Sequence, residues 1–187
     1  TTDDGEQIQN PPRDEYETWV KIEPPGVVCG NNTPFKIFAN FSAKSDNLVV
    51  VFEPGGACWD YDSCTGKNGI RGAANPDGVK DDHWKLAQII SPFLSRFDET
   101  SPSRDWNMVY VPYCTGDVHT GNKVATYTSA GSPDVTFHHD GHAATQQVVK
   151  WIDESFTHVP KMLVTGCSAG GVGSLVNYRF LRKGIHA

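Results

Sequence analysis

Several protein classes are excluded by what this sequence lacks. No apolar run approaches the roughly 18 residues that a transmembrane helix needs, and runs such as Leu48–Phe52 have the length of a strand. The 16 Lys and Arg residues form no cluster and are outnumbered by 22 Asp and Glu residues, giving a net charge of −6. A chain without a basic patch or a basic amphipathic helix is not suited to bind nucleic acid or a membrane surface. We therefore expect neither as a partner.

The cysteines also lack the pattern of a metal site. There are five of them, none in a CxxC pair, so zinc-ligand spacing is absent and no metal is expected. Disulfides are the preferred interpretation, which indicates an oxidising compartment and a secreted or periplasmic protein. The odd number leaves one thiol free or bonded to another polypeptide. The polar beginning, residues 1–5, looks like a mature N-terminus from which a signal peptide has been removed.

Apolar strand patterns alternate with helical ones along most of the chain. Residues 1–33 are polar, contain paired prolines, and are expected to form an N-terminal arm with one or two short strands. The remaining predictions are a half-buried strand at 34–39, buried strands at 47–52, 107–111 and 161–165, helices at 83–90, 141–156 and 169–183, and loops at 60–82 and 114–137. Strands alternating with helices are typical of a parallel sheet covered on both faces.

The motif that carries chemistry is Gly166-Cys167-Ser168-Ala169-Gly170. It fits G-x-S-x-G, the tight strand-to-helix turn that presents a serine hydroxyl above the sheet of an α/β-hydrolase. It follows a buried strand and opens a helix, which is the context that the motif requires. We therefore predict Ser168 as the catalytic nucleophile. The alternative is a glycine-rich turn that serves packing alone.

A second glycine-rich stretch, Glu53–Ala57, follows the first fully buried strand. In α/β-hydrolases one backbone N–H of the oxyanion hole comes from a loop at this place, and the other comes from the residue after the serine. Here the donors would be Gly56 or Ala57 together with Ala169, and the alternative is a plain turn. Both motifs predict an α/β-hydrolase-type, mostly parallel sheet with helices on both faces. The reaction would be two-step acyl transfer to water, with no cofactor.

With these motifs placed, the sequence resembles the pectin acetylesterase/Notum family of carboxylesterases. The matching stretches are 50–59, 105–118 and 166–171, and the likeness extends over residues 35–185. The resemblance implies a serine esterase that removes short acyl groups from polysaccharides or a fatty acyl group from a protein. By motif position it assigns Ser168 as nucleophile and Gly56, Ala57 and Ala169 as oxyanion donors.

One departure from the family pattern concerns the wall of the pocket. The family usually places its Trp directly after the glycines and before the Cys, whereas here Trp59 follows Cys58. The acyl-chain preference therefore does not carry over. The resemblance also implies that Cys58 and Cys64 form a disulfide. Cys167 is expected to be a small buried residue, while Cys114 is left to pair elsewhere.

The acid and base of a Ser–Asp–His triad are missing from their expected place. After Ser168 the chain has no Asp or Glu, and its only later histidine is His186. Chain order also argues against Asp117, which we interpret as a loop-ordering carboxylate. Residues 34–187 would then be the N-terminal portion of one domain, either as a fragment or as one product of a precursor cut near 184–187. In the second case a second polypeptide from that precursor supplies Asp and His. Two other functions stay open, a non-catalytic binding protein and a serine amidase or peptidase.

A histidine-rich segment precedes the helix expected at 141–156. His138 and His142 stand four residues apart, which suits a metal site on one helix face. The segment crosses a loop-to-helix boundary, however, where Asp140 suits an N-cap, so we favour no metal. Instead, His138 or His139 would line the substrate cleft. Trp59 could form part of a platform for carbohydrate or acyl groups, and the alternative is that it packs loops together.

Overall fold

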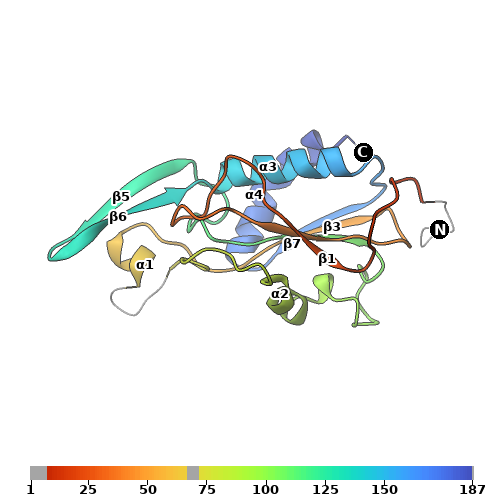
Figure 1. Cartoon of the computed structure of the whole chain (residues 1–187), viewed down its shortest axis with the longest axis horizontal. Coiled ribbons are helices and arrows are strands. Elements are labelled where there is room, and N and C mark those ends of the chain that lie inside the picture. Colours follow the sequence, from red (N-terminus) through yellow and green to blue (C-terminus); the bar gives the residue numbers. More distant parts are fainter. Residues whose placement is uncertain (1–7, 67–71, 187) are drawn as a thin grey trace.

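The structure is a computed structural model that describes residues 8–66 and 72–186. The core of the molecule is a five-stranded mixed sheet (Figure 1). The strand order is β1-β2-β4-β3-β7. Its strands are β1 (Trp19–Ile22), β2 (Ile37–Asn40), β3 (Leu48–Phe52), β4 (Asn107–Val111) and β7 (Met162–Gly166). The pairings β1–β2 and β2–β4 are antiparallel, whereas β4–β3 and β3–β7 are parallel. The first strand, from the predicted arm, therefore extends the sheet at its antiparallel end.

Helices cover both faces of this sheet. The described helices are α1 (Tyr61–Thr65), which lies away from this sheet, and α2 (Trp84–Ile90), the short 3-10 helix η1 (Pro92–Leu94), α3 (Gly141–Ser155) and α4 (Ala169–Gly184). Figure 1 shows α3 and α4 on one side of the sheet and α2 on the other. The helices predicted at 83–90, 141–156 and 169–183 are thus confirmed. Among the described residues, none of these helices is long and apolar enough to span a membrane.

The central strands are buried on both faces, as their apolar runs predict. Every residue of β3 and β4 is buried. The strand at β2 is also fully buried rather than half-buried. The polar Lys36 that suggested alternation lies just before the strand, and Asn40 inside it accepts a hydrogen bond from Arg96 Nε at 2.8 Å. Burial at β2 is therefore possible because its one polar side chain has a partner.

Two segments predicted as loops contain regular structure. The segment 114–137 includes most of a hairpin of β5 (Lys123–Ser129) and β6 (Ser132–His139), which projects from the body of the molecule (Figure 1). These strands pair with each other and stay largely exposed, so they need few apolar residues and give a weak sequence signal. The segment 60–82 contains α1, which begins with a capping box between Asp60 and Ser63.

Strand β7 differs from the prediction of a buried strand. All five of its residues are only half-buried, because within the described part of the chain β3 pairs along one side and nothing pairs along the other. Helix α4, which follows it, exposes several apolar side chains: Val172, Leu175, Val176 and Tyr178. This side of the molecule presents an open sheet edge flanked by an apolar helix face.

Two disulfides and one free thiol account for the cysteines. The predicted Cys58–Cys64 bond is confirmed, and Cys114 pairs with Cys29 of the arm. Cys167 is free, but the expectation that it is buried is wrong, because it is exposed at the open end of β7.

Asp140 occupies the N-cap position of α3 as predicted, yet its side chain makes no cap bond and lies 3.6 Å from His138 Nδ1.

Candidate active site

The turn between β7 and α4 has the geometry of a nucleophile elbow. Ser168 lies between the last strand residue and the first helical residue, with φ 53° and ψ −122°. A positive φ is costly for a non-glycine residue and persists only where the surrounding structure enforces it, which is common at active sites. The Ser168 residue is exposed, whereas Ala169 directly after it is buried. The serine is thus presented to solvent at the N-terminal end of a 16-residue helix, which favours negative charge.

The glycines of the motif are required by close packing of backbone against backbone. A Cβ on Gly166 would lie 2.3 Å from the carbonyl oxygen of Gly170, and one on Gly170 would lie 2.1 Å from the carbonyl oxygen of Phe52. Real Cβ atoms essentially never approach so closely. The elbow therefore rests directly on the end of β3, and its position depends on the absence of side chains there.

This packing gives a prediction with a matched control. Replacing Gly170 by Ala is expected to lower the free energy of unfolding by about 3 kcal/mol, because backbone atoms rather than a flexible side chain must move. Gly171→Ala introduces a Cβ whose nearest neighbour is 3.4 Å away, and a helical Ala is favoured over Gly by up to about 1 kcal/mol. Urea unfolding of both variants tests the difference, and equal midpoints would contradict the described packing.

The loop at residues 53–57, here called the oxyanion loop, begins beside the elbow. Phe52, the last residue of β3, is in register with Gly166, so the two strands end side by side. Gly56 has φ 71°, and a Cβ on it would lie 2.7 Å from the carbonyl oxygen of Gly72. The backbone N–H groups of Gly56, Ala57 and Ala169 donate no hydrogen bond to any described residue. These are the groups that the sequence predicts as oxyanion donors.

A buried carboxylate holds the start of the oxyanion loop. Glu53 accepts hydrogen bonds from the backbone N–H of Tyr113 at 2.6 Å and from Asn75 Nδ2 at 2.8 Å, while its other oxygen lies 2.6 Å from His83 Nε2. Burial and the nearby Glu53 carboxylate raise the pKa of the Tyr110 hydroxyl. The Glu53 carboxylate therefore links the oxyanion loop to His83, which directly precedes α2, and to Tyr113 in the segment after β4. The sequence did not single out this network, although a Glu before Pro-Gly-Gly was visible.

A second loop, residues 115–121, packs between the oxyanion loop and α4. Asp117 accepts four hydrogen bonds, from Thr115 Oγ1 and from the backbone N–H groups of His119, Gly121 and Gly141, at 2.6 to 3.1 Å. This agrees with the predicted loop-ordering role. His119 is 3% exposed, and its Nε2 lies 2.9 Å from the carbonyl oxygen of Glu53. Burial lowers the pKa of the His119 imidazole, partly opposed by that hydrogen bond.

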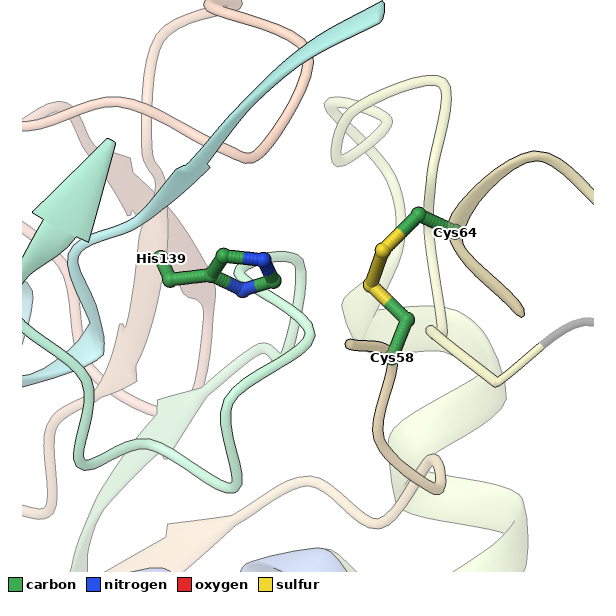
Figure 2. Close-up of side chains that lie close together, drawn as sticks. All are labelled: Cys58, Cys64 and His139. Atoms are coloured by element: carbon green, nitrogen blue, oxygen red, sulfur yellow. A yellow bond between two sulfur atoms is a disulfide. The ribbon is translucent and has the colours of Figure 1, made fainter. Parts of the chain in front are cut away.

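His139 and the Cys58–Cys64 disulfide lie close together, as Figure 2 shows. The His139 ring lies 2.8 Å from the carbonyl oxygen of Thr115 through Nδ1 and 2.9 Å from the Tyr127 hydroxyl through Nε2. The two sulfur atoms are bonded to each other, and both ring nitrogens have protein partners. We therefore interpret Cys58, Cys64 and His139 as structural support for the hairpin.

The predicted pocket residues do not line the cavity beside the elbow. A cavity of about 180 Å³ lies beside the elbow, lined by Phe52, Glu53, Pro54 and Cys167 together with residues of α2, η1 and β4. Among the described residues that line it, neither Trp59 nor His138 nor His139 occurs. Trp59 is 70% exposed next to α1, and His138 is half-buried on β6. Their role in substrate binding stays a prediction.

Comparison with known proteins shows the family of this chain. The model of the family described as "Pectinacetylesterase" matches residues 17–186. The chain belongs to the pectinacetylesterase family. Two relatives are "Palmitoleoyl-protein carboxylesterase notum1a" of Danio rerio, 26% identical over 83% of this chain, and "Pectin acetylesterase 7" of Arabidopsis thaliana, 26% identical over 81% of it. This family membership confirms the resemblance inferred from the three motif stretches.

A solved structure extends the comparison to the fold. The Wnt deacylase Notum from Drosophila covers 90% of this pectinacetylesterase-family chain with a TM-score of 0.62 and 20% sequence identity. The likeness confirms the α/β-hydrolase fold. The chain spans 30% of the Danio rerio relative, 37% of the Arabidopsis thaliana relative and 47% of the Drosophila structure.

Proposed function

We propose that this chain is the nucleophile-bearing part of a secreted carboxylic ester hydrolase that acts through a covalent acyl-enzyme on Ser168. The observation that carries the proposal is the exposed Ser168 in a strained turn, with the N–H group of Ala169 directly after it and those of Gly56 and Ala57 in the neighbouring loop. None of these three N–H groups donates to a described residue. An α/β-hydrolase fold and relatives named as esterases support it. Two disulfides support secretion.

The proposed reaction has two acyl-transfer steps. Ser168 Oγ attacks the ester carbonyl while a histidine takes its proton, and the resulting oxyanion accepts hydrogen bonds from the N–H of Ala169 and of Gly56 or Ala57. The histidine then protonates the leaving alcohol, so the C–O bond of the ester breaks and an acyl-serine remains. Water, activated by the same histidine, releases the carboxylic acid and restores Ser168. No cofactor takes part in these steps.

The triad Asp and His are proposed to lie on polypeptide outside residues 1–187. His186 is separated from Ser168 by the whole 16-residue helix α4, a length of about 24 Å, and its ring lies 3.1 Å from Asp153 instead. His119 is buried with its Nε2 at the carbonyl oxygen of Glu53. The open edge of β7 and the exposed apolar face of α4 are the surfaces that the additional polypeptide would cover. Residues 34–187 are then the N-terminal portion of one domain, with 1–33 as its arm.

The substrate proposed is an ester with an acyl group, on a polysaccharide, a polyester or a lipid-like molecule. The named activities of the relatives, on a palmitoleoyl-protein and on acetylated pectin, bracket long and short acyl chains. Rates of p-nitrophenyl acetate and p-nitrophenyl palmitate hydrolysis by the full-length protein would separate these two classes. A matched p-nitroanilide would separate an esterase from an amidase.

Labelling by a fluorophosphonate tests the nucleophile directly. We expect the probe to attach to Ser168 of the full-length protein, with the modified residue located by peptide mass spectrometry, because such probes need an activated serine and an oxyanion hole. Intact mass spectra, reduced and non-reduced, would reveal whether the Asp and His belong to the same polypeptide or to a second one cut from a common precursor. An unlabelled protein would instead favour a non-catalytic binding protein on this scaffold.

A further inference from the structure

His119 contacts both segments that carry the proposed oxyanion donors, namely the oxyanion loop and helix α4. Its Nε2 lies 2.9 Å from the carbonyl oxygen of Glu53, the first residue of the oxyanion loop. Its backbone carbonyl accepts a hydrogen bond from Asn177 Nδ2 of α4 at 2.9 Å. Its ring also lies against Gly173 of α4, where an added Cβ would be 2.8 Å from His119 Cδ2. One buried residue therefore spans the space between the oxyanion loop and the helix that begins with Ala169.

The backbone that carries His119 is strained. Val118 and His119 both have positive φ, 52° and 63°, although neither is glycine. This conformation costs about 1–2 kcal/mol for each residue and persists only when other contacts enforce it. Those contacts are present, since the Val118 N–H donates to the Tyr113 hydroxyl at 2.8 Å and the His119 N–H donates to Asp117 at 3.1 Å. These hydrogen bonds thus hold the strained backbone, which places the His119 imidazole between the oxyanion loop and α4.

Resting on the proposed esterase function, we propose that His119 is a positioning residue that fixes the oxyanion loop relative to the nucleophile helix α4. Because its partner is a carbonyl oxygen, Nε2 must carry the proton and donate. The ring is held on its other sides by Phe52, with ring centroids 5.1 Å apart, and by Tyr113, at 4.7 Å. A neutral imidazole is retained in this buried position because burial lowers its pKa.

The fixed distance matters because the two donor groups of the oxyanion hole come from different segments. Gly56 and Ala57 belong to the oxyanion loop, while Ala169 begins α4. Donors stabilise the oxyanion when they lie within about 2.7–3.1 Å of it, and a displacement of about 1 Å can lower the rate by about 100-fold. A shift of the oxyanion loop would reduce the stabilisation of the transition state while leaving ground-state binding of the ester almost unchanged.

The test compares two substitutions of His119 in the full-length protein. His119→Phe keeps an aromatic ring but removes the N–H donor, whereas His119→Gln places an amide N–H near the position of Nε2. We expect His119→Phe to lower kcat for p-nitrophenyl acetate by about 30–100-fold, with KM within about twofold. His119→Gln should recover at least a third of the wild-type kcat. Ser174→Ala, at a half-buried position of α4 that makes no described hydrogen bond to His119, serves as the control.

The outcomes separate this proposal from the proposed function. A wild-type protein that is neither labelled nor active overturns both, whereas an active wild-type protein with an equally active His119→Phe variant overturns the positioning role alone. If His119→Phe does not fold, Gly173→Ala replaces it, since its Cβ displaces the ring from the side of α4. A folded Gly173→Ala variant with wild-type kcat, or a His119→Gln variant as slow as His119→Phe, also overturns the positioning role.

Discussion

Replacing Ser168 by Ala in the full-length protein is expected to lower kcat/KM for an activated ester by about four to six orders of magnitude. The hydroxyl is the proposed nucleophile, and removing the nucleophile of a serine hydrolase leaves only the residual contribution of the oxyanion hole and substrate binding. Initial rates with p-nitrophenyl acetate measure the effect, and the fluorophosphonate probe should no longer label the protein.

A serine on the same helix provides the matched control for that substitution. Ser174 is half-buried on α4, and its hydroxyl donates to the carbonyl oxygen of Gly171 at 2.9 Å. Ser174→Ala should therefore leave kcat/KM within about twofold and cost no more than about 1 kcal/mol in stability. A Ser168→Ala variant that kept more than about 1% of the wild-type rate would show that another residue attacks the ester.

The second large effect concerns stability and the two disulfides. Cys29–Cys114 joins positions 85 residues apart, whereas Cys58–Cys64 joins positions 6 apart. In the chain-entropy model, the long loop contributes about 4.6 kcal/mol and the short loop about 2.4 kcal/mol to the free energy of unfolding. We expect the Cys29→Ala/Cys114→Ala variant to lose about 2 kcal/mol more than the Cys58→Ala/Cys64→Ala variant.

Urea unfolding of the two double variants makes this comparison like for like. All four sulfur atoms belong to buried residues, so the loss of packing is similar in both pairs. If both variants unfolded at the same urea concentration with the same slope, loop length would not govern the stabilisation by these two disulfides.

The sequence predicted the parts of this fold that depend on local pattern. The Val-rich runs at β3 and β4 and the spacing of α3 are strong signals, because burial on both faces of a strand or on one face of a helix constrains residue type directly. The turn was likewise predicted, because its glycine pattern reflects a requirement for the absence of side chains: a Cβ on Gly166 or Gly170 would lie 2.3 or 2.1 Å from neighbouring backbone.

The missed features depend on contacts that no local pattern encodes. Among the described residues the β5 and β6 strands pair with each other alone and stay largely exposed, so their mix of Thr, Ser and Lys did not resemble a strand. Gly131 was a usable sign of the turn between them, and in the structure it has φ 73°. The exposure of Cys167 depends on which strand pairs with β7. The link from His119 to Glu53 joins residues 66 positions apart and could be found only in three dimensions.

The parallel register of β3 and β7 separates the parts of this protein that must stay constant from those that are free to change. Both segments assigned to the chemistry leave the sheet from adjacent strand ends, where Phe52 is paired with Gly166. The β5–β6 hairpin is outside that ladder and shares no strand pairing with it. Insertions or deletions at the hairpin tip can therefore accumulate without moving the proposed reacting groups, so the surface of the hairpin can diverge while the arrangement of the elbow and the oxyanion loop is inherited unchanged.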